Sequence, residues 1–278
     1  MQTHQTAAVQ HSICDNTSIE KNHRSATLFF SLPPAIAAHC LNASHLQVLR
    51  LIQPWDLIAY AARPSNDSLC AAAPFHFNAL VQWVLTTCLK PEAAKARAQI
   101  ISTWVQIARC CWELGYISIL LMITAALNST PLSRLKHTWV EVPGDAQREL
   151  GAFIQFCSPI GNYGPLREFV YSHKGVVMPV AILTRDIIML MEMESLSYDV
   201  GDGLDLIPYE QCQSLGKLLT LTPVYHLLQE ETDQELVPLI QFLSNPVPRF
   251  SMEKLYKTSV GLEPIKQIGS RPKSSSWV

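Results

Sequence analysis

Charged residues are scarce in this chain of 278 residues: they make up 16% of the sequence, and neither sign dominates. The 21 Lys and Arg residues nearly balance the 23 Asp and Glu residues, for a net charge of −2. Such a balance gives no electrostatic reason to expect nucleic acid or an anionic membrane surface as the main partner. Long hydrophobic runs are also missing. The longest, Ile117 to Leu127, is about half of what a bilayer span requires, so no transmembrane segment is predicted.

The common motifs of enzymes and metal sites are missing as well. The sequence has no Walker-type phosphate loop, no Gly-x-Ser-x-Gly and no His-Glu-x-x-His, and its histidines are scattered. Its eight cysteines form no Cys-x-x-Cys pair, which favours core thiols in a reducing compartment. We therefore expect no metal, no cofactor and no covalent chemistry. The N-terminus lacks the apolar core of a signal peptide, so a cytoplasmic location is predicted.

The most apolar stretch of the chain runs from Lys95 to Trp139. Apolar residues recur there at three- and four-residue steps between Ile100 and Leu114, on two adjacent stripes, which predicts a helix buried nearly all round. Gly115 separates this helix from a second one over residues 117–127. From the pattern alone, the two form the central αα-hairpin of an all-α, multi-helix globular domain.

Shorter helices are predicted on both sides of this hairpin. Upstream, Pro33-Pro34 opens a helix to about residue 38, and a second short helix covers residues 45–51. A third begins at Pro54, and residues 64–74 form a surface loop before a helix that begins at Phe77. The helices predicted downstream cover residues 147–156, 179–194, 208–222 and 235–243.

The ends of the chain differ from its middle in composition. Residues 1–26 are polar and predict a disordered lead, whereas residues 27–264 form the folded domain. Residues 265–278 are a basic, serine-rich tail. Its last residues, Ser276-Trp277-Val278, fit the pattern of a C-terminal carboxylate captured by a PDZ domain, but a match of three residues also arises by chance.

Particular short segments of the sequence are more informative about family and function than its periodicity. Asn128 closes a buried helix, and Arg134-Leu-Lys-His-Thr-Trp139 follows at once. Tyr163 comes directly after an Asn and four residues before Arg167. A Tyr-x-x-Ser-x-x-Leu-Glu-Pro segment ends at Pro264. Together these segments are similar to the catalytic domain of Ras-family guanine-nucleotide exchange factors, and the resemblance covers about residues 28–264.

This resemblance implies a protruding αα-hairpin made by the helices after Pro179 and Pro208. In the family, that hairpin wedges open the nucleotide site of a small GTPase. Residues 183–188 here read Leu-Thr-Arg-Asp-Ile-Ile, where the family has Leu-Thr-Asp-Leu. With a shift of one residue, Ile188 takes the place of the family's apolar intruder and Glu192 that of its carboxylate. Because they are four residues apart, both side chains point from one helical face.

The resemblance also assigns supporting roles. Leu121, Tyr163 and Arg167 are predicted to contact the GTPase surface, and Asn128 and Arg134 to brace the base of the hairpin. The predicted partner is a Ras-subfamily GTPase of the Ras, Rap or Ral type. The protein is then a GTPase regulator of signal transduction, recruited to the face of a membrane only peripherally, through other domains.

Departures from the family pattern keep a second interpretation open. Many relatives carry a basic Lys-Arg-Arg run on the second hairpin helix, where this chain has Pro208-Tyr-Glu-Gln-Cys-Gln. The alternative is therefore a module with the same fold that docks a GTPase or an adaptor without exchanging its nucleotide.

Overall fold

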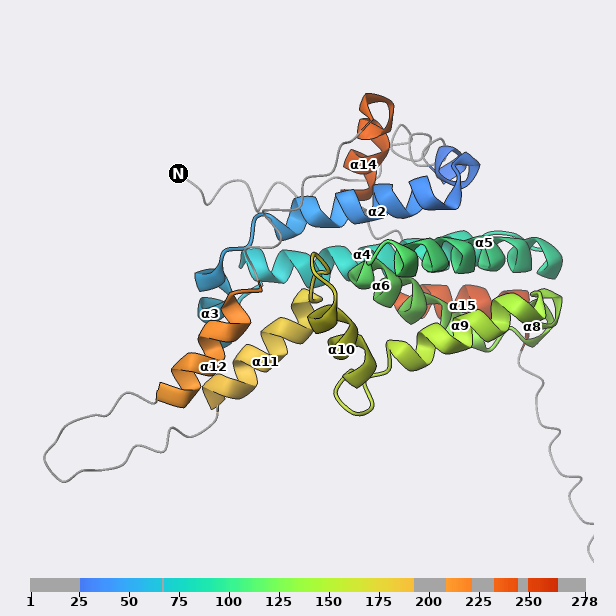
Figure 1. Ribbon diagram of the computed structural model, residues 1–278. Helices are drawn as coiled ribbons and strands as arrows, with labels where there is room; N and C mark the ends of the chain where they lie inside the picture. The colour runs from blue at the N-terminus through green and yellow to red at the C-terminus, as the bar shows by residue number, and fades with distance from the viewer. Residues whose placement is uncertain (1–25, 67, 193–208, 222–232, 245–249, 265–278) are drawn as a thin grey trace, which may run out of the picture.

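The computed structural model in Figure 1 describes residues 26–66, 68–192, 209–221, 233–244 and 250–264. Within these ranges all regular structure is helical and no strand occurs, which confirms the all-α prediction. The predicted lead and tail lie almost wholly outside the described residues, as does the loop predicted between the two hairpin helices.

The helices from α2 to α11 follow one another with short connections. In chain order they are α2 (Pro34–Leu49), α3 (Pro54–Ala62), α4 (Leu69–Leu89), α5 (Ala94–Glu113), α6 (Ile117–Leu127), α7 (Thr130–Ser133), α8 (Lys136–Glu141), α9 (Gly144–Phe156), α10 (Gly164–Ser172), α11 (Val180–Glu192), α12 (Tyr209–Leu219), the 3-10 turn η2 (Gln234–Leu236), α14 (Val237–Ser244) and α15 (Met252–Leu262).

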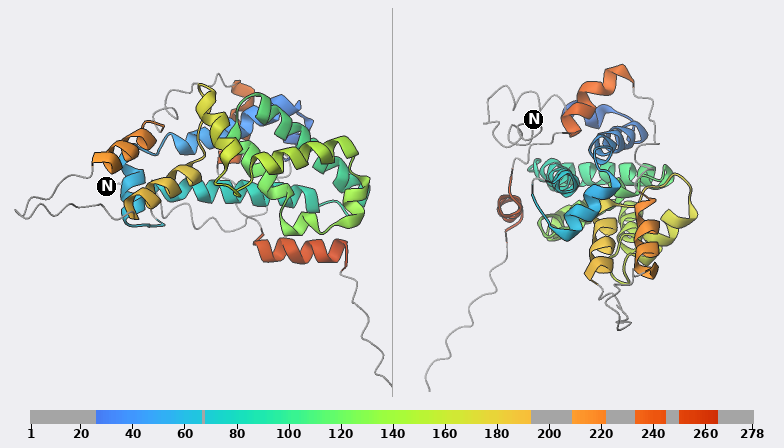
Figure 2. Two further views of the ribbon diagram at one scale, coloured as in Figure 1. Left: turned by 60° about the horizontal axis from the view of Figure 1, so that its bottom comes forward. Right: turned by 90° about the vertical axis from the view of Figure 1, so that its left-hand side faces the viewer.

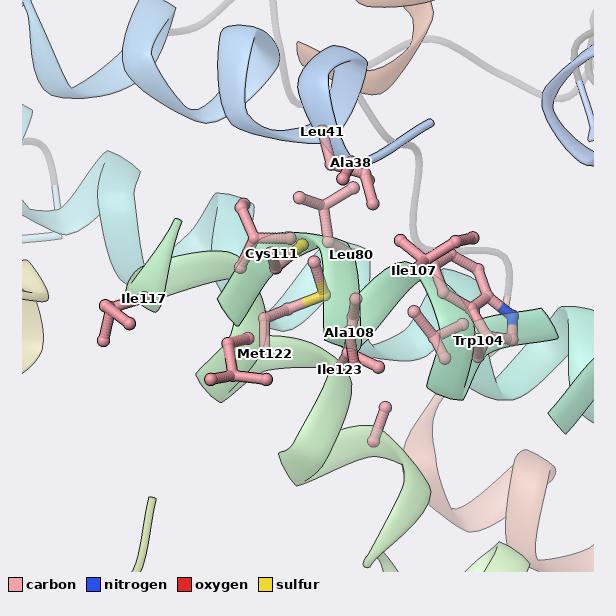
Figure 3. Packing of buried hydrophobic residues seen from close by; sticks show 14 of the residues in the cluster. Ala38, Leu41, Leu80, Trp104, Ile107, Ala108, Cys111, Ile117, Met122 and Ile123 are labelled. Carbon is pink, nitrogen blue, oxygen red and sulfur yellow. The ribbon is translucent and has the colours of Figure 1, made fainter. Parts of the chain in front are cut away.

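The core forms where α2, α4, α5 and α6 pack on one another. Figure 3 shows this packing from close by: Leu41 of α2 and Leu80 of α4 meet Ile107 of α5 and Ile123 of α6. Trp104 is fully buried in the same cluster, and its indole N–H donates to Thr87 Oγ1 at 3.0 Å. The predicted central hairpin of residues 95–127 is thus confirmed as the centre of the domain.

Gly115 allows the sharp reversal between α5 and α6. Its φ of +74° is a left-handed conformation, and a Cβ built there would lie 3.1 Å from Val176 Cγ2. The N–H of Tyr116 donates to Cys111 O at 2.8 Å, which closes the C-terminal turn of α5. Glycine at this position therefore serves both the backbone conformation and the close approach of Val176.

Two predicted boundaries upstream are wrong. The two short helices predicted at residues 34–38 and 45–51 are one helix, α2, because its polar middle is satisfied inside the domain. Ser44 Oγ donates to Leu41 O at 2.7 Å, and His45 is hydrogen-bonded to His76. The predicted loop of residues 64–74 is wrong from residue 69 onward. Ser68 caps the start of α4 by accepting from Cys70 N, and α4 continues through Pro74.

Helix α4 is long and apolar enough to cross a bilayer by length and composition. A buried core helix passes the same test, and α4 packs against α2, α5, α6 and α15. Its fully buried side chains include Val84, Leu85 and Cys88. We therefore assign α4 to the core of the domain.

The C-terminal helix α15 lies along the outside of the bundle, as the left view of Figure 2 shows. Glu263, directly after it, is 8% exposed and accepts hydrogen bonds from Arg97 Nη2 at 3.2 Å and from Thr138 N at 2.9 Å. Burial alone would raise the pKa of Glu263, but hydrogen bonds from Thr138, His137 N–H and Arg97 outweigh it and lower that pKa. These contacts fasten α15 to α5 and α8.

Candidate functional site

Helices α11 and α12 lie side by side at one end of the molecule, in Figure 1 and in the right view of Figure 2. Gln211, in the first turn of α12, donates from Nε2 to Leu190 O, near the end of α11, at 2.5 Å. The start of one helix therefore faces the end of the other, so the two run antiparallel. The pair has the arrangement that the sequence predicts for the hairpin.

Burial changes sharply along α11. Its buried side chains all lie between Val180 and Ile187, where α11 packs on α3 and α4. Beyond Ile187 no residue of α11 is buried: Ile188 is half-buried, Met189 is 59% exposed and Glu192 is exposed. Helix α12 buries no side chain at all. Among the described residues, the site thus presents a half-buried aliphatic and an exposed acidic side chain one helical turn apart.

Arg167 of α10 contacts α11 directly. Its Nη1 donates to Asp186 Oδ2 at 2.6 Å and its Nη2 donates to Asp186 Oδ1 at 2.8 Å. Both side chains are largely buried, at 15% and 16% exposure. The hydrogen bonds to Asp186 raise the pKa of Arg167, so the guanidinium is charged throughout the physiological range. The structure therefore places Arg167 in an intramolecular ion pair, where the sequence predicts a contact with the GTPase.

The turn before α10 belongs to the same cluster. Asn162 and Tyr163 have φ values of 58° and 56°, which are unusual for residues other than glycine. The backbone oxygen of Asn162 accepts from Arg167 Nε at 2.8 Å, and its side-chain oxygen accepts from Arg185 Nη2. The Arg185 guanidinium lies over the Tyr163 ring, 5.4 Å from the centroid. Tyr163 and Arg167 are therefore brought together with the first hairpin helix.

Leu121 and Asn128 lie elsewhere on the domain. Leu121 is a half-buried residue of α6 that packs against the core. Asn128 caps the C-terminal end of α6, where its backbone N–H donates to Thr124 O at 3.0 Å, and its side chain is exposed. The predicted role of Leu121 in GTPase contact and that of Asn128 in hairpin support stay predictions.

Arg134 contacts the C-terminal helix among the described residues, and its predicted role at the base of the hairpin stays a prediction. Its Nη1 donates to Ser259 O at 2.6 Å and its Nη2 donates to Glu263 O at 2.7 Å. These hydrogen bonds cap the last carbonyls of α15, at a helix end that attracts positive charge. Arg134 thus anchors the C-terminal helix and has its partners away from α11 and α12.

Sequence reasoning missed two residues of this site, Asp186 and Arg185. Asp186 lies in the segment that identifies the first hairpin helix, yet nothing in the sequence pairs it with Arg167, 19 residues earlier. The only signal is composition: α10 and α11 each hold one arginine, and their acids are Glu168, Asp186 and Glu192. Among the described residues, no group of three or more His, Cys, Asp and Glu side chains lies close enough to hold a metal ion.

Comparison with known proteins agrees with this geometry. The family model described as "RasGEF domain" matches residues 36–213. Ras-GEF domain-containing family member 1C from Homo sapiens is 39% identical over 238 residues, covering 69% of this chain and 50% of the relative. The mouse Ras-specific guanine nucleotide-releasing factor RalGPS1 is 26% identical over 247 residues, covering 83% of this chain and 41% of the relative.

A third relative, Ras guanyl-releasing protein 3 from Homo sapiens, is 21% identical over 266 residues, covering 94% of this chain and 38% of the relative. The chain thus spans about half the length of these curated relatives or less. The family match extends from α2 through the first half of α12 and includes both helices of the site. The chain therefore belongs to the RasGEF domain family.

Proposed function

We propose that this chain promotes the release of guanine nucleotide from a Ras-subfamily small GTPase of the Ras, Rap or Ral type. The observation that carries the proposal is the exposed half of α11, where Ile188 and Glu192 lie one turn apart beyond the buried segment. The neighbouring helix α12 packs on α11 and buries none of its own side chains completely, and Glu192 remains exposed among the described residues. Relatives named as Ras guanyl-releasing protein and RalGPS1 support the class of partner.

The proposed mechanism needs no covalent step by this chain. Mg²⁺ in a GTPase site requires near-octahedral oxygen ligands. An aliphatic group such as Ile188, pushed beside the metal position, offers no ligand and blocks the ion. A carboxylate such as Glu192, near the phosphate position, repels the phosphates and competes for the backbone N–H groups that bind them.

Linkage then gives the energetics. A protein that binds the nucleotide-free GTPase more tightly than the loaded one weakens nucleotide binding by the same factor. Releasing a ligand held at about 16 kcal/mol, as for a picomolar complex, demands several kcal/mol of such differential binding. An interface of about 1,000 Å² or more is of the size that stable complexes use. The hairpin with Leu121 and Tyr163 is the proposed contact surface.

The test is release of a fluorescent GDP analogue from a panel of Ras, Rap, Ral and Rho-type GTPases, with and without the chain. Accelerated release from a Ras-subfamily member supports the proposal and names the partner. Glu192→Ala is expected to slow release at least about tenfold, since it removes a charge aimed at the phosphates. Glu253→Ala, on the exposed face of α15, is the matched control. Equal loss in both variants, or none in Glu192→Ala, contradicts the assigned role.

One observation favours the second candidate, a docking module without exchange activity. Residues Tyr209–Leu219 of α12 contain a single basic residue, Lys217, and no basic run. Retention of a nucleotide-free GTPase on the immobilised chain, together with no acceleration of GDP release across the panel, would select this candidate over exchange.

We also propose a cytoplasmic location, with recruitment to the membrane face where a lipid-anchored GTPase would be held. The seven cysteines that the structure describes are all free thiols, as expected of a reducing compartment. Fractionation of cells that express the chain with and without its GTPase tests this placement. The predicted PDZ ligand, residues 276–278, lies outside the described residues and stays a prediction.

A further inference from the structure

Helix α10 connects the core to the first hairpin helix through two side chains of different chemistry, Phe169 and Arg167. At the core end, the Phe169 ring packs against Trp112 of α5, with centroids 4.8 Å apart, and against Phe156 of α9 at 5.8 Å. At the other end, Arg167 makes its two hydrogen bonds to Asp186 of α11. The two functions lie on successive faces of one short helix, so α10 links α5 to α11 physically.

Apart from the contacts of Arg185 with Asn162 and Tyr163 and the hydrogen bond from Gln211 to Leu190 O, the remaining contacts of α11 are mainly apolar. Val180, Ile182, Leu183 and Ile187 bury it against neighbours that include α3 and α4. Packing of apolar faces restricts the angle between helices to a few classes, each with a scatter of about 15–20°. A bidentate pair between Arg and a carboxylate is directional, because two parallel hydrogen bonds define one plane. The contact with Asp186 can therefore fix the orientation of α11 within the range that the apolar face allows.

The turn that precedes α10 helps to hold the Arg167 side chain in place. Its left-handed residues Asn162 and Tyr163 carry a conformational cost, which surrounding contacts must offset. Arg167 supplies such contacts: Nε donates to Asn162 O at 2.8 Å and Nη2 to Asn162 Oδ1 at 3.2 Å. Arg167 is thus held from its own side as well, and it reaches Asp186 from a fixed position.

We propose that Arg167 and Asp186 form a brace that sets the angle of the hairpin relative to the core. Arg167 is then a positioning residue, which acts on the exchange reaction through α11 and makes no contact with the GTPase. The consequence for exchange rests on the proposed function, whereas the brace itself concerns only this chain. Because Ile188 and Glu192 follow Asp186 by two and six residues on the same helix, a change of angle at Asp186 displaces both.

A matched control exists in the same domain. Arg109 of α5 donates to both carboxylate oxygens of Glu149 in α9, at 2.5 and 2.6 Å. This pair is also a bidentate contact between Arg and a carboxylate, made through Nε and Nη2, but it joins two helices of the body and Arg109 is 51% exposed. Loss of an ion pair in general is therefore measured by Arg109→Ala, and loss of the brace by Arg167→Ala or Asp186→Ala.

The experiment measures the position of the hairpin directly. Cys212 on α12 is the exposed thiol among the described cysteines and takes one nitroxide label. Gln106→Cys, on the exposed side of α5, takes the other, with Cys14→Ser and Cys110→Ser as background. Pulsed electron-electron resonance then gives the distribution of distances between α5 and α12. Circular dichroism of each labelled protein establishes that the helices are intact.

The brace predicts a single narrow distribution in the parent protein and a broadened or shifted one in Arg167→Ala and Asp186→Ala. The double variant should match the single ones, because the two residues act as a unit. Asp186→Asn, which keeps the side-chain volume, should give an intermediate result. A distribution unchanged in Arg167→Ala would overturn the proposal, as would equal broadening in Arg109→Ala.

Exchange kinetics provide the second readout. If the hairpin angle controls insertion, Arg167→Ala and Asp186→Ala lower the maximal rate of GDP release about tenfold or more, as small misplacements of reacting groups do. Arg109→Ala should leave that rate unchanged. If the parent protein releases no nucleotide from any GTPase, the exchange proposal fails alone, because the distance distributions still decide whether the brace exists.

Discussion

Two helices of equal length, α6 and α12, show how differently this domain treats its parts. Each has 11 residues, but nine residues of α6 are buried and none of α12 is. Helix α6 packs against α2, α4, α5 and α9, whereas α12 has its main contact with α11. Because α6 is packed by neighbouring helices, its sequence is constrained by packing. The described residues leave one face of α12 uncovered, so its sequence can be shaped by binding to a partner.

Polar contacts repeat this contrast. On the body of the domain they include a buried network at Glu263, which accepts hydrogen bonds from Arg97, Thr138 and the His137 N–H. On the hairpin, the described polar side chains beyond Asp186 are exposed or half-buried, among them Glu192, Glu210 and Lys217. Because of this difference, the same chemical change should lower stability strongly in the body and weakly in the hairpin.

The largest effect is expected from Glu263→Ala. The substitution leaves Arg97, which is 2% exposed, without its carboxylate. An uncompensated buried charge costs about 3–5 kcal/mol, so we expect a loss of about 4 kcal/mol in the free energy of unfolding. Urea titration followed by circular dichroism measures it. Glu253→Ala removes an exposed pair with Lys257 and should change stability by less than about 0.5 kcal/mol. Similar losses in the two variants would contradict the buried character of the Glu263 network.

A smaller loss is expected from Leu120→Ala in α6. Leu120 is fully buried, and its truncation removes apolar contacts and leaves a cavity in the core. Substitutions of this kind cost about 2–5 kcal/mol, and we expect about 3 kcal/mol here. Thermal and urea unfolding measure the loss. A change below about 1 kcal/mol would mean that α6 is not the packed centre of the domain.

A third effect concerns pH and the contact between α14 and the body. Burial lowers the pKa of both His45 and His76, so both rings are neutral in the folded state. His76 Nε2 donates to Leu243 O at 2.9 Å, and its unprotonated Nδ1 then accepts from His45 Nδ1–H at 3.3 Å. Burial, with a contribution from His76, lowers the pKa of His45 from 6.5 to about 3.

The sign of the effect follows from this pKa. Between pH 6.5 and pH 3 the unfolded chain binds a proton at His45, whereas the folded chain does not. The free energy of unfolding therefore falls as the pH falls through this window. Between pH 7 and pH 5 the loss from His45 is about 2 kcal/mol. Urea titrations at several pH values measure it. His45→Gln keeps a donor for His76 and should flatten the slope. An unchanged slope in that variant would remove His45 as its source.

The sequence predicted the well-packed region better than the region with the open surface. The apolar stripes from Ile100 to Leu114 and the run to Leu127 place α5 and α6 almost to the residue, because burial on all sides leaves an unambiguous period. The apolar period did not predict helix boundaries correctly where polar residues are buried. Ser44 and His45 suggested a break in α2, but their hydrogen bonds lie inside the domain and no break occurs.

The site was predictable in its elements and less so in its contacts. The order of the motifs places Ile188 and Glu192 on α11 and Tyr163 beside it. The intramolecular partners of the two arginines were not predicted, because a guanidinium reaches any carboxylate or carbonyl that the fold brings near it. Arg134 lies 125 residues from Ser259 in the chain, and Arg167 lies 19 from Asp186. Only tertiary structure selects among such distant acceptors.

The smallest loss of stability is expected from a leucine in α12. Leu218 of α12 is half-buried against the core, and Leu218→Ala repeats in the hairpin the chemistry of Leu120→Ala in α6. We expect a loss below about 1 kcal/mol, because little apolar surface is removed from water there and the space that the side chain leaves is open to solvent. The same urea titration measures both variants. A large loss in Leu218→Ala would show that α12 is part of the packed domain, and the surface at Ile188 and Glu192 would then be less available to a partner than its exposure implies.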